Sequence, residues 1–249
     1  MLVLNDTNIW LHVTKTGGVF LRSWLIDHVP PQYITFSHGG ARHVAEYHFN
    51  PEVMKFWSEV VTTEPKHRVL YEKDKEAGMH MFACRSDHMT LNKLNPEYLR
   101  GKKIFFFTRE PMSWLYSKAK YAKQNELADT FKEGLEKVDM REQILPWHWC
   151  DHLRIPDCEL YMMKYEYLYT NIIQMLTLSG VPVTNHMIRT LVEYEWLNAA
   201  KYDNISVNQE VSIEELEEKH RQIDPRIAYF YNEEKEIPWK LCDKMKIEG

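Results

Sequence analysis

The strand, turn and helix near the N-terminus constrain the fold of this chain more than any other segment. Apolar residues predict a strand over 8–13, a Thr-Lys-Thr-Gly turn follows over 14–17, and an amphipathic helix is predicted over 18–28. Glycine lets a backbone approach an anion, the first turn of a helix presents N–H groups, and Lys15 adds a positive charge. The segment therefore indicates an anion-binding turn within an α/β fold.

Strands and helices alternate along the rest of the chain. The clearest later strand is the apolar run 103–108, which ends before Arg109 and precedes a helix predicted over 111–125. Such alternation predicts an α/β protein with a central, mainly parallel sheet flanked by helices. Ligands bind beyond the carboxyl ends of such strands, so Lys15 and Arg109 are expected to share one crevice. The other predicted elements are strands over 33–36, 68–71, 79–84 and 160–165, helices near 51–60, 90–99 and 170–179, and a helix that starts at a capping box at Ser212.

Composition narrows the class of protein. The 249 residues are 44% hydrophobic and contain no linker-like or repeated segment, so we expect a single domain over 1–249. The net charge of −5 disfavours nucleic acid as a partner, and no apolar run approaches the roughly 20 residues that span a membrane. Four scattered cysteines and a first strand too early to follow a signal peptide predict a cytoplasmic protein. No metal site is expected, and the oligomeric state stays open.

The turn at Lys15 differs from the phosphate loop of nucleotide triphosphatases. In that motif, G-x-x-x-x-G-K-[ST], both glycines are required, whereas Ile9 and Thr14 stand at their positions here. The sequence therefore predicts a phosphate loop of another kind. The alternative interpretation is an ordinary strand-to-helix turn that carries a lysine.

A second anion-binding group is predicted at Arg109. Ser117 follows it by eight residues, nearly two turns into the predicted helix, and so can face the same side as the end of the strand. An arginine fork and a hydroxyl at this separation can bind a phosphate. Together with Lys15, these residues predict a ligand that carries phosphate at two ends.

The ordered set of these segments resembles the cofactor signature of sulfotransferases that use 3′-phosphoadenosine 5′-phosphosulfate (PAPS), most closely the carbohydrate-type branch. The resemblance implies a P-loop-like sulfotransferase fold and PAPS as donor, with no metal. Lys15 would stabilise the leaving group, with the turn holding the 5′-phosphosulfate and Arg109 with Ser117 holding the 3′-phosphate. The similar segments are Lys15-Thr16-Gly17-Gly18, Ser86-Asp87-His88-Met89-Thr90, the run 104–111 with 117–121, Tyr165-Glu166-Tyr167-Leu168 and Asn204-Ile205-Ser206.

The residues expected to bind the cofactor are Thr14, Lys15, Thr16, Gly17, Gly18, Val19, Phe20, Arg109, Ser117 and Asn204. The chain departs from the family pattern after the glycines, where the usual hydroxyl residues are replaced by Val19 and Phe20. It also carries Trp114 or Leu115 where the family often has arginine or lysine. The first departure removes hydroxyl donors from the turn and leaves its backbone N–H groups to bind the oxygens.

Transfer of a sulfuryl group needs a base to take the proton of the acceptor hydroxyl or amine. His88 is the first choice for this role, because its place before the Arg109 strand resembles that of the family's catalytic histidine. His38 is the second choice, and Glu166 is a further alternative. The expected acceptor is a small molecule or a glycan. Two other functions stay open, namely a P-loop kinase with Thr16 as magnesium ligand and a non-catalytic nucleotide-binding module.

Overall fold

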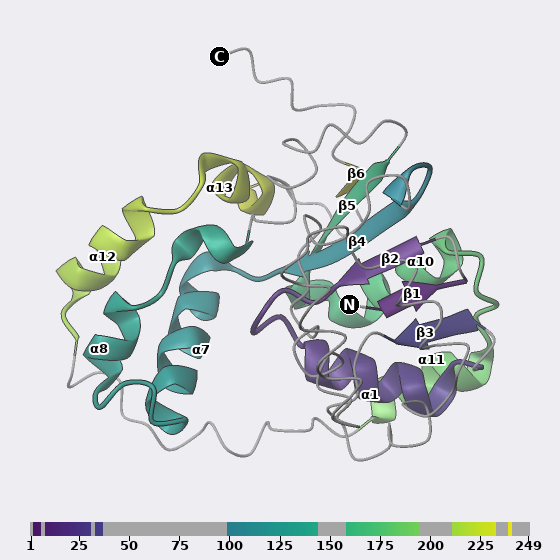
Figure 1. Cartoon of the computed structure of the whole chain (residues 1–249), viewed down its shortest axis with the longest axis horizontal. Coiled ribbons are helices and arrows are strands. Elements are labelled where there is room, and N and C mark those ends of the chain that lie inside the picture. Colours follow the sequence, from purple (N-terminus) through teal and green to yellow (C-terminus); the bar gives the residue numbers. More distant parts are fainter. Residues whose placement is uncertain are drawn as a thin grey trace, which may run out of the picture.

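The computed structural model describes residues 2–5, 8–30, 33–36, 99–143, 158–194, 211–232 and 239–240. Within these residues the chain forms one six-stranded sheet with helices packed beside it (Figure 1). The α/β class is therefore confirmed. The strands predicted over 68–71 and 79–84 and the helix near 51–60 lie outside the described residues, as does the helix near 90–99 except for its last residue.

Three adjacent strands in the middle of the sheet are parallel. They are β2 (Asn8–Leu11), β4 (Lys103–Thr108) and β5 (Glu159–Lys164), and their register aligns Ile9 with Ile104 and Leu160. The outer strands are β1 (Leu2–Leu4), β3 (Ile34–Phe36) and β6 (Trp239–Lys240), in the order β3-β1-β2-β4-β5-β6. β1 pairs antiparallel with β2 and β3, and β6 pairs antiparallel with β5. The three parallel strands agree with the sequence prediction of a parallel centre. The sheet is not mainly parallel, however, because three of its five pairings are antiparallel, and β1 and β6 are additional strands.

Both faces of the parallel strands are buried, which explains why β4 is apolar without alternation. One cross-strand row consists of Trp10, Phe105 and Tyr161, and the rings of Phe105 and Tyr161 stack with centroids 5.0 Å apart. Successive side chains of a strand point to opposite faces, so Ile9 and Ile104 face the other side, where both are fully buried.

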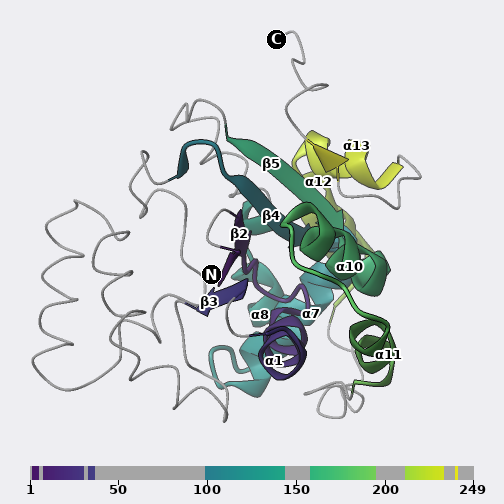
Figure 2. The same ribbon diagram turned by 90° about the vertical axis from the view of Figure 1, so that its right-hand side faces the viewer.

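Three helices cover the face that carries Trp10. α1 (Gly18–His28), α10 (Leu168–Leu178) and α11 (Asn185–Glu193) pack there into one apolar core with the strands (Figure 2). Phe20, Leu21 and Trp24 of α1 are fully buried in this core. α10 is followed by Gly180 at a φ of 70°, the left-handed conformation that its predicted stop requires.

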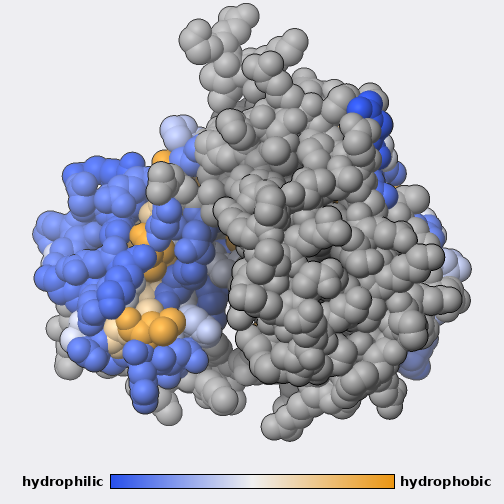
Figure 3. Space-filling view, in the orientation of Figure 1, coloured by the Kyte–Doolittle hydropathy of each residue, from blue (hydrophilic) through white to orange (hydrophobic). Residues whose placement is uncertain are grey.

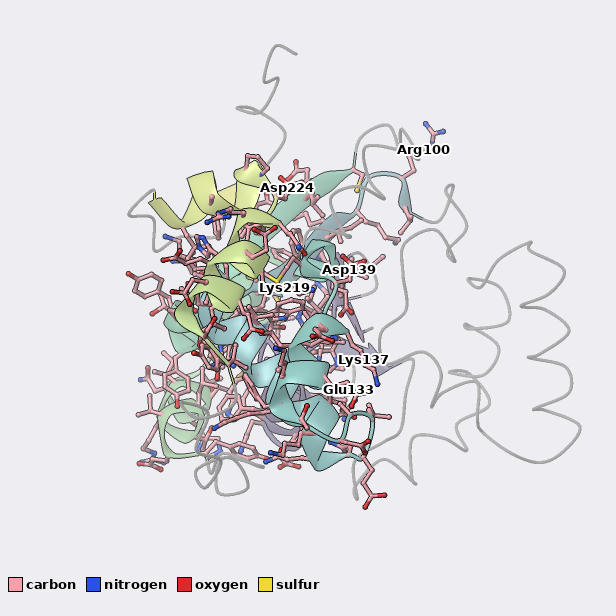
Figure 4. The ribbon with its side chains drawn as sticks, turned by 90° about the vertical axis from the view of Figure 1, so that its left-hand side faces the viewer. Arg100, Glu133, Lys137, Asp139, Lys219 and Asp224 are labelled. Atoms are coloured by element: carbon pink, nitrogen blue, oxygen red, sulfur yellow. The ribbon has the colours of Figure 1, made fainter. Side chains whose placement is uncertain are left out.

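A second apolar cluster lies beyond the carboxyl ends of the strands. It joins α7 (Pro111–Gln124), α8 (Phe131–Glu136) and α12 (Ile213–Arg221) (Figure 1). The outer surface of these helices is largely hydrophilic (Figure 3). Lys219 of α12 ties these helices together by donating to the carbonyls of Glu136 and Val138 at 3.0 and 3.2 Å (Figure 4). The capping box predicted at Ser212 is present, with Glu215 as its reciprocal partner.

α13 (Pro225–Asn232) follows α12 and lies next to β5, where Phe230 is fully buried and Lys164 of β5 stands over its ring. None of the helices in the described ranges is long and apolar enough to cross a membrane. The carboxyl ends of β2, β4 and β5 thus meet at one edge of the sheet, where the turn before α1 and the start of α7 lie side by side.

Candidate functional site

The turn between β2 and α1 has an unusual backbone. Lys15 adopts a φ of 63° and Gly17 a φ of 77°, both in the left-handed region. Lysine rarely adopts this conformation, which costs on the order of 1 kcal/mol. Gly17 is the N-cap of α1 and has no side chain to accept from the first-turn N–H groups, while its carbonyl accepts the first helical bond from Leu21 at 3.0 Å. The turn over 14–17 and the helix over 18–28 are confirmed.

Two rings lie directly against the glycines of this turn. A Cβ atom on Gly18 would stand 1.8 Å from Nε2 of His12, and one on Gly17 would stand 2.9 Å from the ring of Tyr165. The His12 ring also stacks on Trp10, with centroids 5.4 Å apart and an interplanar angle of 20°. Glycine is therefore required at both positions because His12 and Tyr165 occupy the space of a side chain.

Two side chains of the turn and the start of α1 point into the protein. The hydroxyl of Thr16 is buried and donates to the carbonyl of Val13 at 2.7 Å, which closes the turn. The ring of Phe20 is 1% exposed and belongs to the core beneath α1. Among the residues expected to bind a cofactor, Thr16 and Phe20 thus contribute to the architecture of the turn, while Thr14, Lys15 and Val19 are half-buried.

Lys15 lies close to two other cations. Burial, followed by repulsion from Arg109 and Lys118, lowers the pKa of Lys15 from 10.5 to about 8. Its Nζ sits 4.6 Å from the centre of the Tyr121 ring, a favourable cation–π contact. The structure therefore brings Lys15 and Arg109 together at the edge of the sheet, where they raise the local positive potential.

Arg109 is held by two neighbours at the end of β4. Its Nε–H donates to the hydroxyl of Ser113 at 2.9 Å, and its guanidinium lies 4.7 Å from the centre of the Tyr165 ring. Ser117, which the sequence pairs with Arg109, lies one helical turn further along α7 and is half-buried. Arg109 donates to the hydroxyl of Ser113, four residues before Ser117, and a shared role of Arg109 and Ser117 in phosphate binding stays a prediction.

Glu110 and Glu166 fix the start of α7 beside Arg109. The Glu110 carboxylate caps the helix by accepting from the N–H groups of Met112 and Ser113 at 3.0 and 2.7 Å. Glu166 accepts from the Glu110 N–H at 2.8 Å and, through its other oxygen, from the Tyr231 hydroxyl at 3.0 Å. Burial and the Glu166 charge raise the pKa of Tyr231 well above its usual value. These contacts give Glu166, the alternative base of the sequence prediction, a structural role.

Trp114 connects α7 to the turn. Its indole N–H donates to the backbone carbonyl of Thr14 at 2.8 Å, and its side chain is fully buried. Lys118, one turn later, donates to the Thr14 hydroxyl at 3.2 Å. Trp114 is one of the departures from the sulfotransferase pattern, and here it sets the position of the Lys15 turn relative to the Arg109 helix.

Several residues of the site are not predicted by the sequence. His12 and Tyr165 could be noticed only because they adjoin the turn and the end of β5, and Ser113, Trp114 and Tyr121 only from their spacing along α7. The predicted bases His88 and His38 and the predicted cofactor residue Asn204 lie outside the described residues. No group of three or more metal-ligating side chains occurs within the described ranges.

Comparison with known proteins adds no relative. No family model, curated protein or solved structure matches the chain.

Proposed function

We propose that this protein is a sulfotransferase that moves a sulfuryl group from PAPS to a hydroxyl or amine of a small molecule or glycan. The observation that carries the proposal is that Lys15 and Arg109 follow two neighbouring parallel strands, with the Tyr165 ring lying against both Gly17 of the Lys15 turn and the Arg109 guanidinium. Each cation belongs to a different strand end, and each rests on a tyrosine ring. One small ligand with two anionic groups could pair with both cations.

The electrostatics around Lys15 support an anionic ligand. Lys15 is partly buried among like charges, which lowers its pKa, and a bound anion would stabilise its protonated form. The glycine-capped start of α1 adds N–H groups and the positive end of the helix dipole. The residues present therefore fit a phosphate or phosphosulfate group at the Lys15 turn and a second phosphate at Arg109.

The positions of these residues indicate the role of each in the proposed reaction. When bound, PAPS supplies the sulfuryl group, which the acceptor takes from the phosphate oxygen. Lys15 places its charge beside the turn, where it stabilises negative charge that develops on that oxygen. Arg109 orients the nucleotide, and the Trp114 hydrogen bond connects the helix after Arg109 to the Lys15 turn. His88, or His38 in its place, is proposed to accept the proton of the acceptor.

The alternative function as a kinase is less well supported. It needs the Thr16 hydroxyl as a magnesium ligand, but this hydroxyl is buried and already donates to the Val13 carbonyl. The alternative function as a non-catalytic module is based on the lack of a hydroxyl side chain at positions 19 and 20. Phe20 is instead buried in the core.

The proposal is tested by incubating the protein with PAPS and a panel of hydroxyl and amine acceptors, then searching by mass spectrometry for products heavier by one sulfuryl group. We expect such a product with the wild type and none with Lys15→Ala. Binding of adenosine 3′,5′-bisphosphate without turnover on any acceptor would favour the non-catalytic module. Stabilisation by ATP and magnesium, but not by the bisphosphate, would favour the kinase.

A further inference from the structure

We propose that Thr14 and Lys118 form a further oxyanion subsite beside the Lys15 turn, and that the carboxylate of Glu142 fills this subsite until a ligand phosphate or sulfate displaces it. The inference rests on the proposed function only in assigning the displacing group to PAPS. The subsite itself requires no more than an anionic ligand at the turn.

The three side chains form a closed set of contacts. Lys118 Nζ lies 2.6 Å from Oε2 of Glu142. The Thr14 hydroxyl donates to the same oxygen at 3.0 Å, and Lys118 also donates to the Thr14 hydroxyl at 3.2 Å. One carboxylate oxygen therefore receives a charged donor and a hydroxyl donor together, as a phosphate oxygen does in a phosphate site.

The subsite adjoins the groups assigned to the ligand. Thr14 immediately precedes Lys15, and its carbonyl is held by Trp114. Lys118 acts on the Lys15 pKa, so the two ammonium groups share one electrostatic environment. An oxyanion held at the turn by Lys15 lies within the field of Lys118, and its charge competes with that of Glu142.

The Glu142 contact is suited to exchange. The Glu142 side chain is 31% exposed and that of Lys118 is 18% exposed, so water reaches the pair and limits its contribution to stability. Glu142 belongs to η3 (Met140–Gln143), whose Met140 is buried in the cluster of α7 and α8. The backbone of η3 is thus anchored, and rotation of the glutamate side chain alone can vacate the subsite.

The experiment measures the affinity of the full-length protein for inorganic pyrophosphate by isothermal titration calorimetry. Glu142→Gln is expected to bind pyrophosphate about five- to tenfold more tightly than the wild type, because the competing carboxylate is gone. Glu136→Gln, which removes an exposed carboxylate of α8, is the matched control and is expected to leave the affinity unchanged. In a Lys118→Met background the effect of Glu142→Gln is expected to vanish, because both anions depend on Lys118.

An unchanged or weaker affinity in Glu142→Gln would overturn the proposal, since Glu142 would then position Lys118 for the ligand. A gain that persists in Lys118→Met, or that Glu136→Gln shares, would overturn it as well, because a general charge effect would suffice. If no variant binds pyrophosphate, the proposed subsite does not exist and the proposal is overturned. A further outcome separates the subsite from the proposed function. If Glu142→Gln binds pyrophosphate more tightly only when Lys118 is present, but the protein does not prefer adenosine 3′,5′-bisphosphate to ATP with magnesium, the subsite is retained and PAPS is rejected as donor.

Discussion

The indole N–H of Trp114 donates to the backbone carbonyl of Thr14 at 2.8 Å, across 100 residues of sequence. This bond joins the helix that follows Arg109 to the turn that carries Lys15. The segments that carry the two cations are thereby connected, and preorganisation of this kind strengthens ligand binding because less order must be created on association.

Trp114→Phe tests the connection. The variant keeps the aromatic ring but loses the hydrogen bond, so we expect a loss of about 1–2 kcal/mol in the free energy of unfolding. We also expect weaker binding of adenosine 3′,5′-bisphosphate. Denaturant titration and calorimetry measure the two effects. Trp24→Phe is the control, because Trp24 is equally buried and its indole N–H has no hydrogen-bond partner among the described residues. An equal loss of ligand affinity in Trp24→Phe would contradict the role of the Trp114 bond.

Ligand affinity is expected to depend on pH through Lys15. The pKa of Lys15 is about 8 in the folded protein, and a bound anion raises it. Binding of adenosine 3′,5′-bisphosphate at pH 8.5 should therefore take up part of a proton, and the affinity should fall as the pH rises above 8. Calorimetry in buffers of different ionisation enthalpy measures this proton uptake. Lys15→Arg, which stays charged, should lose the dependence. A flat affinity between about pH 7 and 10 in the wild type would contradict the shift in pKa.

The lowered pKa of Lys15 also affects the stability of the fold. Lys15 titrates at about 8 in the folded protein and at its ordinary value of 10.5 in the unfolded chain, which therefore binds more protons between these values. The free energy of unfolding should rise with pH across this window. Lys15→Met should remove this rise and stabilise the ligand-free protein at pH 7, by less than about 1 kcal/mol because Lys15 is partly solvated. Denaturant titrations at pH 7 and pH 10 provide the measurement, and a less stable Lys15→Met would contradict it.

Gly18→Ala tests the packing under the turn. The new methyl group would collide with the His12 ring, 1.8 Å away, and we expect a loss of about 1–3 kcal/mol in stability. Removing the ring in a His12→Ala, Gly18→Ala double variant should recover part of this loss, which a double-mutant cycle resolves. Strictly additive losses would show that the His12 ring does not impose the glycine.

Arg109→Lys tests the second end of the ligand. Lysine keeps the charge but loses the planar fork, the bond to Ser113 and the stacking on Tyr165. We expect this variant to bind adenosine 3′,5′-bisphosphate about tenfold less tightly, with little change for AMP, which lacks the 3′-phosphate. Fluorescence or calorimetric titration with both nucleotides measures the difference. Equal losses for the two would place the 3′-phosphate elsewhere.

The local structure is more predictable from the sequence than the contacts between distant segments. The apolar run 103–108, the turn with Gly17 and the capping box at Ser212 follow local rules, and all three are confirmed. β1 is not predicted from the sequence because three residues are too few to show the alternation of apolar and polar side chains. Its pairing with β2 and β3 defines it as a strand.

The site is predictable only in part for the same reason. Lys15 and Arg109 stand at strand ends, so topology alone places them at one edge. The contact of Ser113 with Arg109 depends on how α7 leaves β4, and the contact of Trp114 with Thr14 joins residues 100 positions apart. Neither contact leaves a periodic signal in the sequence.

The proposed function requires that Lys15 and Arg109 bind the two phosphate groups of one adenosine ligand. This requirement is tested by the equilibrium affinity of the wild type and Lys15→Ala for adenosine 3′,5′-bisphosphate, AMP, and ATP with magnesium at pH 7. We expect the wild type to bind the bisphosphate most tightly and Lys15→Ala to lose most of this affinity. Tighter binding of ATP with magnesium, or bisphosphate binding that Lys15→Ala leaves intact, would contradict the proposed function.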